Sequence, residues 1–303
     1  MKILITGGSG FLGRNLVNEL SKIKNYKIYV CDKIKIKFNK KNIFFTKCNL
    51  INANSFNKII PNFDYIFHMA AELGVKNVIN NPINTLNKNY ISTKNVIEFA
   101  KINKKLKRIF FFSTSEVYSK LNKNNKMSET DKIEMPNIFH PRSSYWLSKI
   151  LGEFLTINSK LPYTIFRVFN VYGPDIKTTH VIPSIFKKLK SKKKIIFENP
   201  GHIRCFIFIN DAIKIFKLSM KTQFKNKILN VGNPSEPIKI KLLVKLTSQI
   251  INIKKNYSFV NLNNQSVNVR VPDIKRLEKL IGKKFQFIKL KDGLQYIKNQ
   301  YEN

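Results

Sequence analysis

Two residues that could exchange protons stand four positions apart in the stretch SSYWLSK: Tyr145 and Lys149. On a helix, this spacing places both side chains on the same face. A lysine cation beside a tyrosine stabilises tyrosinate and lowers the tyrosine pKa, which turns a poor acid into a usable base near neutral pH. The pattern is common by chance, so it predicts a catalytic pair only where other residues supply the rest of a site.

A second set of reactive groups follows a run of aromatic residues. The run Phe110–Phe112 predicts a buried strand, yet it leads directly into the polar stretch Ser113–Glu116. Hydroxyl and carboxylate groups cost free energy to bury unless they find hydrogen-bond partners. Two interpretations follow: the strand ends in solvent, or its end holds a ligand that uses these groups.

The stretch TGGSGFLG has the residues of a dinucleotide-binding turn. Gly7, Gly10 and Gly13 follow the apolar stretch KILIT and precede an amphipathic segment. Glycines let the backbone turn tightly and approach a pyrophosphate, which then lies at the N–H groups of the helix start. Asp32 ends the next expected strand, where a carboxylate accepts hydrogen bonds from an adenosine ribose and repels a 2′-phosphate. The pattern favours NAD over NADP, although Lys33 follows this carboxylate.

Strands alternate with helices over the first half of the chain, which predicts a parallel sheet covered on both faces. We expect strands at 2–6, 26–32, 42–49, 63–71, 108–112 and 163–170, helices at 14–23, 83–102 and from 145, and a loop at about 120–144. Further along, a helix at 181–191 and a strand at 204–209 belong to a less regular pattern. The predicted fold class is α/β, a doubly wound parallel Rossmann sheet with a smaller, interleaved α/β C-terminal substrate lobe.

The same pattern divides the chain into two expected domains. Residues 1–170 form the Rossmann domain, to which residues 204–235 return. Residues 171–203 and 236–303 form the lobe that binds the substrate.

The composition is that of a globular chain with a strong basic excess. The chain has 303 residues, of which 43% are hydrophobic, and its formal net charge is +37. Such a charge is a feature of nucleic-acid-binding proteins, but lysines supply nearly all of it and are spread over the whole chain. We attribute the charge to compositional drift and expect no nucleic-acid binding. Arginines are few and suit bidentate sites; four of the seven lie in stretches with candidate functional residues, Arg142, Arg167, Arg204 and Arg270.

Other classes of protein lack support in the sequence. No apolar run approaches the roughly eighteen residues that a membrane helix needs, and the N-terminal run is too short for a signal peptide. Three cysteines without CxxC spacing and four scattered histidines indicate neither a disulfide framework nor a metal site. We expect a cytoplasmic protein with no metal and no membrane contact.

Together the motifs resemble the extended short-chain dehydrogenase/reductases of the NAD-dependent nucleotide-sugar epimerase/dehydratase family. The similarity extends nearly from end to end and includes TGGSGFLG, HMAA, STSEVY, YWLSK, RVFNVYGP and RVPDIKRLEKLIG. It implies an enzyme with NAD as its cofactor and a nucleotide-diphosphate sugar as its substrate. It also implies a homodimer formed through the helices around residues 84–102 and 145–158.

The resemblance assigns roles to individual residues. The expected catalytic residues are Thr114, Ser115, Glu116, Tyr145 and Lys149. The expected NAD-binding residues are Gly7, Gly10, Phe11, Leu12, Gly13, Asp32, Asn49, Leu50, Ala70, Ala71 and Asn89, together with Tyr145 and Lys149. The expected substrate-binding residues are Thr114, Asn170, Arg204 and Arg270. The last three are assigned to the nucleotide diphosphate, which agrees with the preference of arginine forks for phosphate.

The implied reaction begins with oxidation at C4 of the sugar. Thr114 hydrogen-bonds O4 while Tyr145 removes its proton, and hydride leaves C4 for the nicotinamide, which gives a 4-keto sugar. An epimerase then needs only rotation of the ketone before the hydride returns. In a dehydratase, Glu116 removes the acidified C5 proton and water is lost from C6. A substrate with a C6 carboxylate instead becomes a β-keto acid and loses carbon dioxide.

The residues near the implied base leave these outcomes open. The stretch Thr114–Glu116 resembles decarboxylases and certain dehydratases, whereas many dehydratases carry Asp-Glu, and YWLSK differs from the YDEGK of many decarboxylases. We expect an epimerase or dehydratase, with a UDP-glucuronate-type decarboxylase as an alternative. An NADPH-dependent 4-ketosugar reductase is a further alternative, which Asp32 disfavours. A non-catalytic basic Rossmann protein that binds polyanions is the alternative of a different class.

Overall fold

The computed structural model describes residues 1–118, 126–135, 137–191, 194–262, 267–282 and 285–301. Part of the loop expected at about 120–144 lies outside these residues. The chain forms two compact units, each built from several segments. The first comprises Met1–Val117, Met135–Val168 and Ile213–Leu229, and the second comprises Tyr118–Glu134, Phe169–Ala212 and Asn230–Asn303. Of the residues that the sequence pattern assigns to the Rossmann domain, 118–134, 169–170, 204–212 and 230–235 belong to the second unit.

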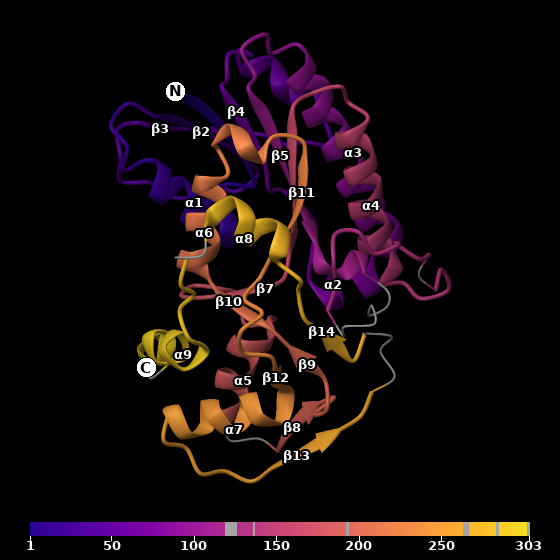
Figure 1. The fold of residues 1–303 in the computed structure, drawn as a ribbon, viewed down its shortest axis with the longest axis vertical. Coiled ribbons are helices and arrows are strands. Elements are labelled where there is room, and N and C mark those ends of the chain that lie inside the picture. The colour runs from indigo at the N-terminus through magenta and orange to yellow at the C-terminus, as the bar shows by residue number, and fades with distance from the viewer. Residues whose placement is uncertain (119–125, 136, 192–193, 263–266, 283–284, 302–303) are drawn as a thin grey trace. The chain divides into compact units, whose positions relative to one another are not determined.

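A seven-stranded sheet is the centre of the first unit, and its strand order is β11-β6-β5-β4-β1-β2-β3 (Figure 1). The strands are β1 (Lys2–Thr6), β2 (Lys27–Asp32), β3 (Ile43–Lys47), β4 (Tyr65–His68), β5 (Arg108–Thr114), β6 (Tyr163–Val168) and β11 (Lys227–Val231). The pairs from β3 across to β6 are parallel. Because the chain proceeds outward from β1 in both directions, the sheet is doubly wound, and the predicted fold class is confirmed.

β5 runs through the middle of the sheet, and all seven of its residues are buried. A strand covered on both faces reads as a continuous apolar run, which explains the aromatic stretch in the sequence. The Phe110 ring stacks on Phe67 with centroids 4.2 Å apart. On the opposite face, a Cβ added at Gly152 would lie 2.2 Å from the Phe111 ring, so the helix that carries Gly152 packs closely against β5.

Helices cover both faces of the sheet. The helices that contain residues of the first unit are α1 (Phe11–Leu20), α2 (Val75–Asn80), α3 (Pro82–Lys101), α4 (Ser143–Ile157) and α6 (Ile209–Leu218). Helices α3 and α4 lie side by side (Figure 1), whereas Phe216 of α6 contacts Phe112 on the other face of β5. Helices α1 and α4 begin at Phe11 and Ser143, earlier than the sequence pattern predicts.

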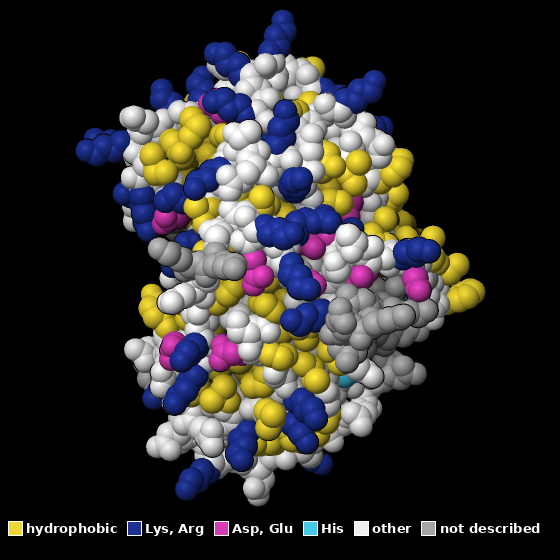
Figure 2. All heavy atoms as spheres, in the orientation of Figure 1, with side chains coloured by type: hydrophobic (Ala, Val, Ile, Leu, Met, Phe, Trp, Pro, Cys, Tyr) yellow, Lys and Arg dark blue, Asp and Glu magenta, His cyan; other side chains and the backbone are white. Residues whose placement is uncertain are grey.

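Lysine and arginine side chains are scattered over the face of the molecule shown in Figure 2 and do not gather into one stripe. This distribution agrees with compositional drift as the origin of the basic charge. Among the described residues, no helix combines the length and the apolar character needed to cross a membrane.

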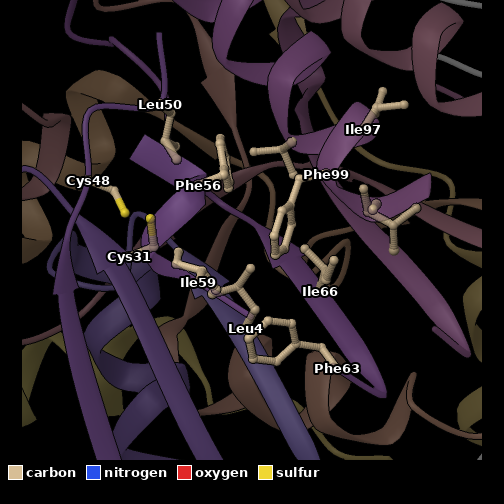
Figure 3. Close-up of a cluster of buried hydrophobic side chains, with 13 residues drawn as sticks. Leu4, Cys31, Cys48, Leu50, Phe56, Ile59, Phe63, Ile66, Ile97 and Phe99 are labelled. Atoms are coloured by element: carbon tan, nitrogen blue, oxygen red, sulfur yellow. The ribbon is translucent and has the colours of Figure 1, made fainter. Parts of the chain in front are cut away.

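An apolar cluster packs against the sheet near the end of β2 (Figure 3). It includes Leu4 of β1, Ile66 of β4 and Phe99 of α3, with Cys31 and Cys48 side by side at its edge. All three cysteines of the chain are buried free thiols. The cluster anchors the end of β2, which is where the carboxylate of the expected ribose site lies.

The second unit contains shorter strands and helices. They are β7 (Asn170–Tyr172), α5 (Val181–Lys190), β8 (Ile195–Glu198), β9 (Ile203–Arg204), β10 (Phe206–Phe208), β12 (Ile238–Lys239), α7 (Ile240–Ile250), β13 (Tyr257–Val260), β14 (Val269–Arg270), α8 (Lys275–Ile281) and α9 (Leu290–Lys298). The strand predicted at 204–209 is two strands that separate at Cys205. There the Cys205 carbonyl accepts a hydrogen bond from the Asn170 side chain at 3.1 Å.

Candidate active site

The catalytic residues expected from the sequence meet at the carboxyl end of β5. The strand ends at Thr114, and a 3-10 turn, η2 (Ser115–Val117), carries the chain onward. Thr114 Oγ1 accepts a hydrogen bond from the Glu116 N–H at 3.2 Å. Thr114 and Ser115 are buried, so these polar residues do not mark a strand that runs out into solvent. Buried hydroxyls need partners, and α4 provides one.

Tyr145 lies in the first turn of α4, and its hydroxyl lies close enough to the Thr114 hydroxyl for Thr114 to lower its pKa. Burial and the negative charge of Glu116 raise the pKa of Tyr145 above its ordinary value, while the Thr114 hydroxyl and the Arg142 cation oppose this increase. The sequence pattern predicts a lowered tyrosine pKa, and in this geometry the direction is the opposite. Burial disfavours the phenolate more than its polar neighbours favour it.

Lys149 lies one helical turn beyond Tyr145 and is buried. Its Nζ atom donates a hydrogen bond to the Phe112 carbonyl at 2.7 Å and lies 5.1 Å from the Phe111 ring centroid. The same atom is 5.9 Å from the centroid of the Tyr145 ring. Burial lowers the pKa of Lys149 to about 8, and the carboxylate of Glu153 opposes this change. Lys149 therefore carries a positive charge below about pH 8, one helical turn from Tyr145.

An ion pair borders this group at the start of α4. The Arg142 guanidinium donates to Glu116 Oε1 at 2.7 Å, and the two side chains are 19% and 22% exposed. Arg142 stands three residues before Tyr145, and Glu116 two residues after Thr114. This outer ion pair thus places one positive and one negative charge beside the tyrosine hydroxyl.

The glycine-rich turn between β1 and α1 has no room for side chains. Gly7 has a φ of +72°, and a Cβ built on it would lie 2.6 Å from the Ala70 backbone. A Cβ on Gly13 would lie 2.2 Å from the Gly7 carbonyl oxygen. The turn leads directly into α1, whose first residues are Phe11 and Leu12. A close-packed backbone that ends in helical N–H groups is the surface that a dinucleotide pyrophosphate requires, so the residues present fit NAD.

Asp32 ends β2 and faces the glycine-rich turn. Its carboxylate accepts hydrogen bonds from the Ser9 N–H at 3.0 Å and from the Ile34 N–H at 3.1 Å. These two bonds fix the carboxylate at the edge of the turn and leave lone pairs for ribose hydroxyls. The geometry agrees with the predicted preference for NAD.

The remaining predicted NAD-binding residues lie around the ends of the neighbouring strands. Asn49 is exposed just after β3, and the carbonyl of the buried Leu50 accepts a hydrogen bond from Asn95 at 2.9 Å. Ala70 and Ala71 follow β4, where the Ala70 backbone lies against Gly7 of the glycine-rich turn.

Asn89 is buried, and its side-chain amide is bonded on both sides. It accepts from the Glu72 N–H at 2.7 Å, and it donates to the Glu72 carbonyl at 3.1 Å and to Ser148 Oγ at 3.0 Å. Asn89 on α3 therefore ties the loop after β4 to α4. It supports the cofactor side of the site by holding that loop.

Sequence reasoning missed two buried residues next to the catalytic group. His68 bonds Thr6 at 2.8 Å and Thr93 at 3.0 Å, and burial lowers the pKa of His68 to about 3, so the ring is neutral. Glu153 is buried four residues after Lys149. The helical spacing from Lys149 was a usable signal for Glu153, whereas nothing local in the sequence marks His68.

The predicted diphosphate-binding residues all lie in the second unit. Arg204 on β9 and Arg270 on β14 are direct partners in a parallel strand pair. Arg204 donates to the Ile203 carbonyl at 2.8 Å and to the Asn268 carbonyl at 3.0 Å. Within this unit the structure brings the two arginines together. Across the described part of the chain, no three His, Cys, Asp or Glu side chains form a group that could hold a metal ion.

Comparison with known proteins gives consistent relatives. The chain is 32% identical over 248 residues to UDP-N-acetyl-alpha-D-glucosaminuronate decarboxylase of Bacillus cytotoxicus, which covers 78% of this chain and 76% of that protein. It is 30% identical over 315 residues to a putative UDP-glucose 4-epimerase of Methanocaldococcus jannaschii, which covers 99% and 98% of the two chains.

Among solved structures, a UDP-glucose 4-epimerase from Thermotoga maritima with UDP-glucose has the same fold, with a TM-score of 0.86 and 22% identity over 99% of this chain and 98% of that one. Residues 3–232 match the NAD dependent epimerase/dehydratase family. The glycine-rich turn, the Tyr-Lys helix and these matches agree, and the chain belongs to the NAD-dependent epimerase/dehydratase family.

Proposed function

We propose that this protein is a nucleotide-sugar epimerase or dehydratase that oxidises the sugar at C4 and recycles its bound NAD in each turnover. The observation that carries the proposal is the grouping of Tyr145, Thr114 and Lys149 at the carboxyl end of β5. Thr114 lowers the pKa of Tyr145, and Lys149 Nζ lies 5.9 Å from the centroid of the Tyr145 ring. These groups share the first unit with a glycine cradle that fits the cofactor. A hydroxyl pair beside a buried cation is the set that proton removal from a sugar hydroxyl requires.

In this mechanism the residues of the chain bind the O4 hydroxyl of the sugar and transfer its proton. When bound, NAD supplies a cationic nicotinamide ring that accepts hydride from C4. Thr114 hydrogen-bonds the O4 hydroxyl, and Tyr145 takes its proton as the C4–O4 bond becomes a carbonyl. Lys149 favours the phenolate that this step needs, because its charge lies within reach of the ring. In an epimerase, Tyr145 then returns the proton to O4 as C4 regains hydride, which restores the starting forms of the residues.

The NAD-binding residues follow from the geometry of the turn. Gly7, Gly10 and Gly13, with Phe11 and Leu12, would hold the pyrophosphate, and Asp32 would accept from the ribose. An NADPH-dependent ketoreductase would need a cation where Asp32 stands. Asn170, Arg204 and Arg270 would bind the nucleotide diphosphate of the substrate, a role that the family resemblance supports.

A second candidate, decarboxylation of a nucleotide hexuronate, shares the C4 oxidation. The stretch Thr114–Glu116 and the similarity to the Bacillus cytotoxicus decarboxylase favour it. After C4 oxidation, a C6 carboxylate leaves as carbon dioxide without a base at C5. In a dehydratase, by contrast, Glu116 must remove the C5 proton, so Glu116→Gln separates the two outcomes.

A homodimer through α3 and α4 is part of the proposal. Apolar side chains on these helices are exposed: Ile83, Ile91, Leu151, Phe154 and Ile157. A second copy of the chain would bury them, which is a reason for such a patch on an otherwise charged surface. Phe154→Asp should convert a dimer into a monomer in sedimentation velocity; a wild-type monomer would contradict this part of the proposal.

Incubation with candidate substrates tests the function. The protein with NAD is mixed with UDP-, GDP- and dTDP-hexoses and hexuronates, and the products are analysed by mass spectrometry. Loss of water identifies a dehydratase, loss of carbon dioxide a decarboxylase, and an isomer of unchanged mass an epimerase. Tyr145→Phe should lower turnover by about 10²- to 10⁴-fold, whereas Tyr296→Phe, an exposed tyrosine on α9, should not.

The contrary outcome is equally definite. No product with any of these sugars, joined to full indifference to Tyr145→Phe in any assay, would remove the catalytic proposal. A steep decrease of polyanion affinity with salt would then favour the non-catalytic alternative.

A further inference from the structure

A buried carboxylate that the proposed reaction does not use lies directly behind Lys149. Glu153 accepts hydrogen bonds from Ser113 Oγ at 2.5 Å, from Arg167 Nε at 3.0 Å and from the terminal Arg167 nitrogen at 2.8 Å. The side chains of Arg167 and Glu153 are only 4% and 5% exposed. Ser113 and Arg167 are direct partners in the register of β5 and β6. This inner ion pair therefore spans two strands and α4.

The inner ion pair is linked to Lys149 in two ways. Glu153 follows Lys149 by four residues, so both side chains lie on the face of α4 that packs on β5. On β5, the Phe112 carbonyl binds Lys149, and the next residue, Ser113, binds Glu153. One strand thus positions the lysine and its carboxylate together.

The charges around Lys149 make Glu153 important. His68 on β4 is neutral, because burial lowers its pKa to about 3, and β5 contributes a carbonyl and an aromatic ring. Arg167 on β6 lies on the far side of Glu153, and Glu116 in η2 is held in the outer ion pair. Two buried cations, Lys149 and Arg167, therefore flank one buried carboxylate.

We propose that Glu153 is a positioning residue that keeps Lys149 protonated beside Tyr145, and that Ser113 and Arg167 fix the Glu153 carboxylate for this task. The proposal rests on the role of Lys149 in the proposed function. A buried lysine loses its proton readily, and a fixed carboxylate counteracts that loss. Arg167 has the opposite effect: its positive charge offsets part of the negative charge of Glu153, which disfavours the protonated form of Lys149.

The test uses the opposite effects that Glu153 and Arg167 should have on the pKa of Lys149. The pKa of Lys149 is measured without substrate, by competitive acetylation over a pH series and mass spectrometry of the peptide that contains Lys149. Glu153→Gln should lower the pKa of Lys149 by about one unit, and Arg167→Gln should raise it. Glu153→Asp should recover part of the wild-type value. Glu98→Gln, which breaks an exposed ion pair with Lys101, should leave it unchanged.

A purely structural role predicts another pattern. In that case both variants would move the pKa of Lys149 in the same direction or leave it unchanged, and either result would overturn the inference. If Glu153→Gln fails to fold, the double variant Glu153→Gln/Arg167→Gln removes both charges and should still lower the pKa of Lys149, by a smaller amount. An unchanged pKa in a folded double variant would also overturn it.

Activity separates this inference from the proposed function. With a converted substrate, Glu153→Gln should lower kcat about fivefold near pH 8 with little change in KM, since only the fraction of protonated Lys149 changes. Loss of activity in Tyr145→Phe without the opposed shifts would contradict the inference alone. Opposed shifts in a protein that converts no sugar would contradict the proposed function alone.

Discussion

Two arginine–glutamate pairs flank the catalytic helix, and their bond lengths hardly differ. The outer pair joins Arg142 to Glu116 at 2.7 Å, and the inner pair joins Arg167 to Glu153 at 2.8 Å. The outer side chains are about four times more exposed than the inner ones, at 19% and 22% against 4% and 5%. The inner carboxylate also accepts from Ser113, so its oxygens have partners on two strands.

The difference shows that burial decides what an ion pair can do. A buried pair has already lost its hydration, so removal of one partner leaves an uncompensated charge inside the protein. A partly exposed pair can be replaced by water at little cost. Breaking the inner pair should therefore change both the stability of the protein and the protonation of Lys149. The outer pair has more influence on the proton chemistry of Tyr145 than on the fold.

The largest expected effect comes from breaking the inner pair. Arg167→Gln leaves the Glu153 carboxylate buried without its bidentate partner, and the free energy of unfolding should fall by about 3–5 kcal/mol. Urea denaturation followed by circular dichroism measures the change. Arg142→Gln is the matched control, because it removes an arginine from an equally short pair and should cost less than about 1 kcal/mol. Equal losses in the two variants would contradict the comparison.

A smaller effect is expected from the hydroxyl that completes the inner pair. Ser113→Ala removes one hydrogen bond to a buried carboxylate, which should cost about 1.5–3 kcal/mol. The control is Ser144→Ala, because Ser144 Oγ donates to the neutral carbonyl of Pro141 at 2.8 Å. That bond should contribute about 0.5–1.5 kcal/mol. Equal midpoints of urea denaturation for the two variants would show that the charge of Glu153 does not strengthen the contribution of the Ser113 hydrogen bond to stability.

The same contrast explains which parts of the fold and site the sequence can predict. The glycine turn, the Tyr145–Lys149 pair and the polar end of β5 are local patterns that can be read from the sequence, and together they predict one site. The alternation of strands and helices in the sequence predicts the sheet, but it does not predict where the surrounding helices begin. Helix α4 begins two residues before Tyr145, where Ser143 and Ser144 donate to the carbonyls of Asn137 and Pro141. Hydroxyls that satisfy nearby carbonyls leave no clear signal in an apolar pattern.

The inner ion pair could not be predicted for a different reason. Arg167 is conspicuous in a lysine-rich chain, and Glu153 has helical spacing from Lys149. Their contact, however, depends on the register that sets Ser113 opposite Arg167. Register is set by packing along the whole strand. The raised pKa of Tyr145 was missed for a related reason, because burial follows from the assembled fold.

The smallest expected effect is on the acidity of Tyr145, and it comes from the outer pair. Arg142 lowers the pKa of Tyr145 and Glu116 raises it, so Arg142→Gln should raise that pKa by about half a unit, the equivalent of about 0.7 kcal/mol. In the proposed reaction Tyr145 acts as the phenolate, and at pH 7, below its pKa, the phenolate fraction falls as the pKa rises. The expected result is about a threefold loss of kcat/KM at pH 7.

The pH dependence distinguishes this electrostatic effect from a loss of substrate contacts. Raising the pH by about half a unit should restore kcat/KM in Arg142→Gln, as long as the pH stays below the value of about 8 at which Lys149 loses its proton. Arg142→Lys keeps the positive charge without the planar fork and should behave like the wild type in this profile. A loss that is equal at every pH would mean that Arg142 binds the substrate directly. The outer pair would then serve recognition, and its contrast with the inner pair would be greater.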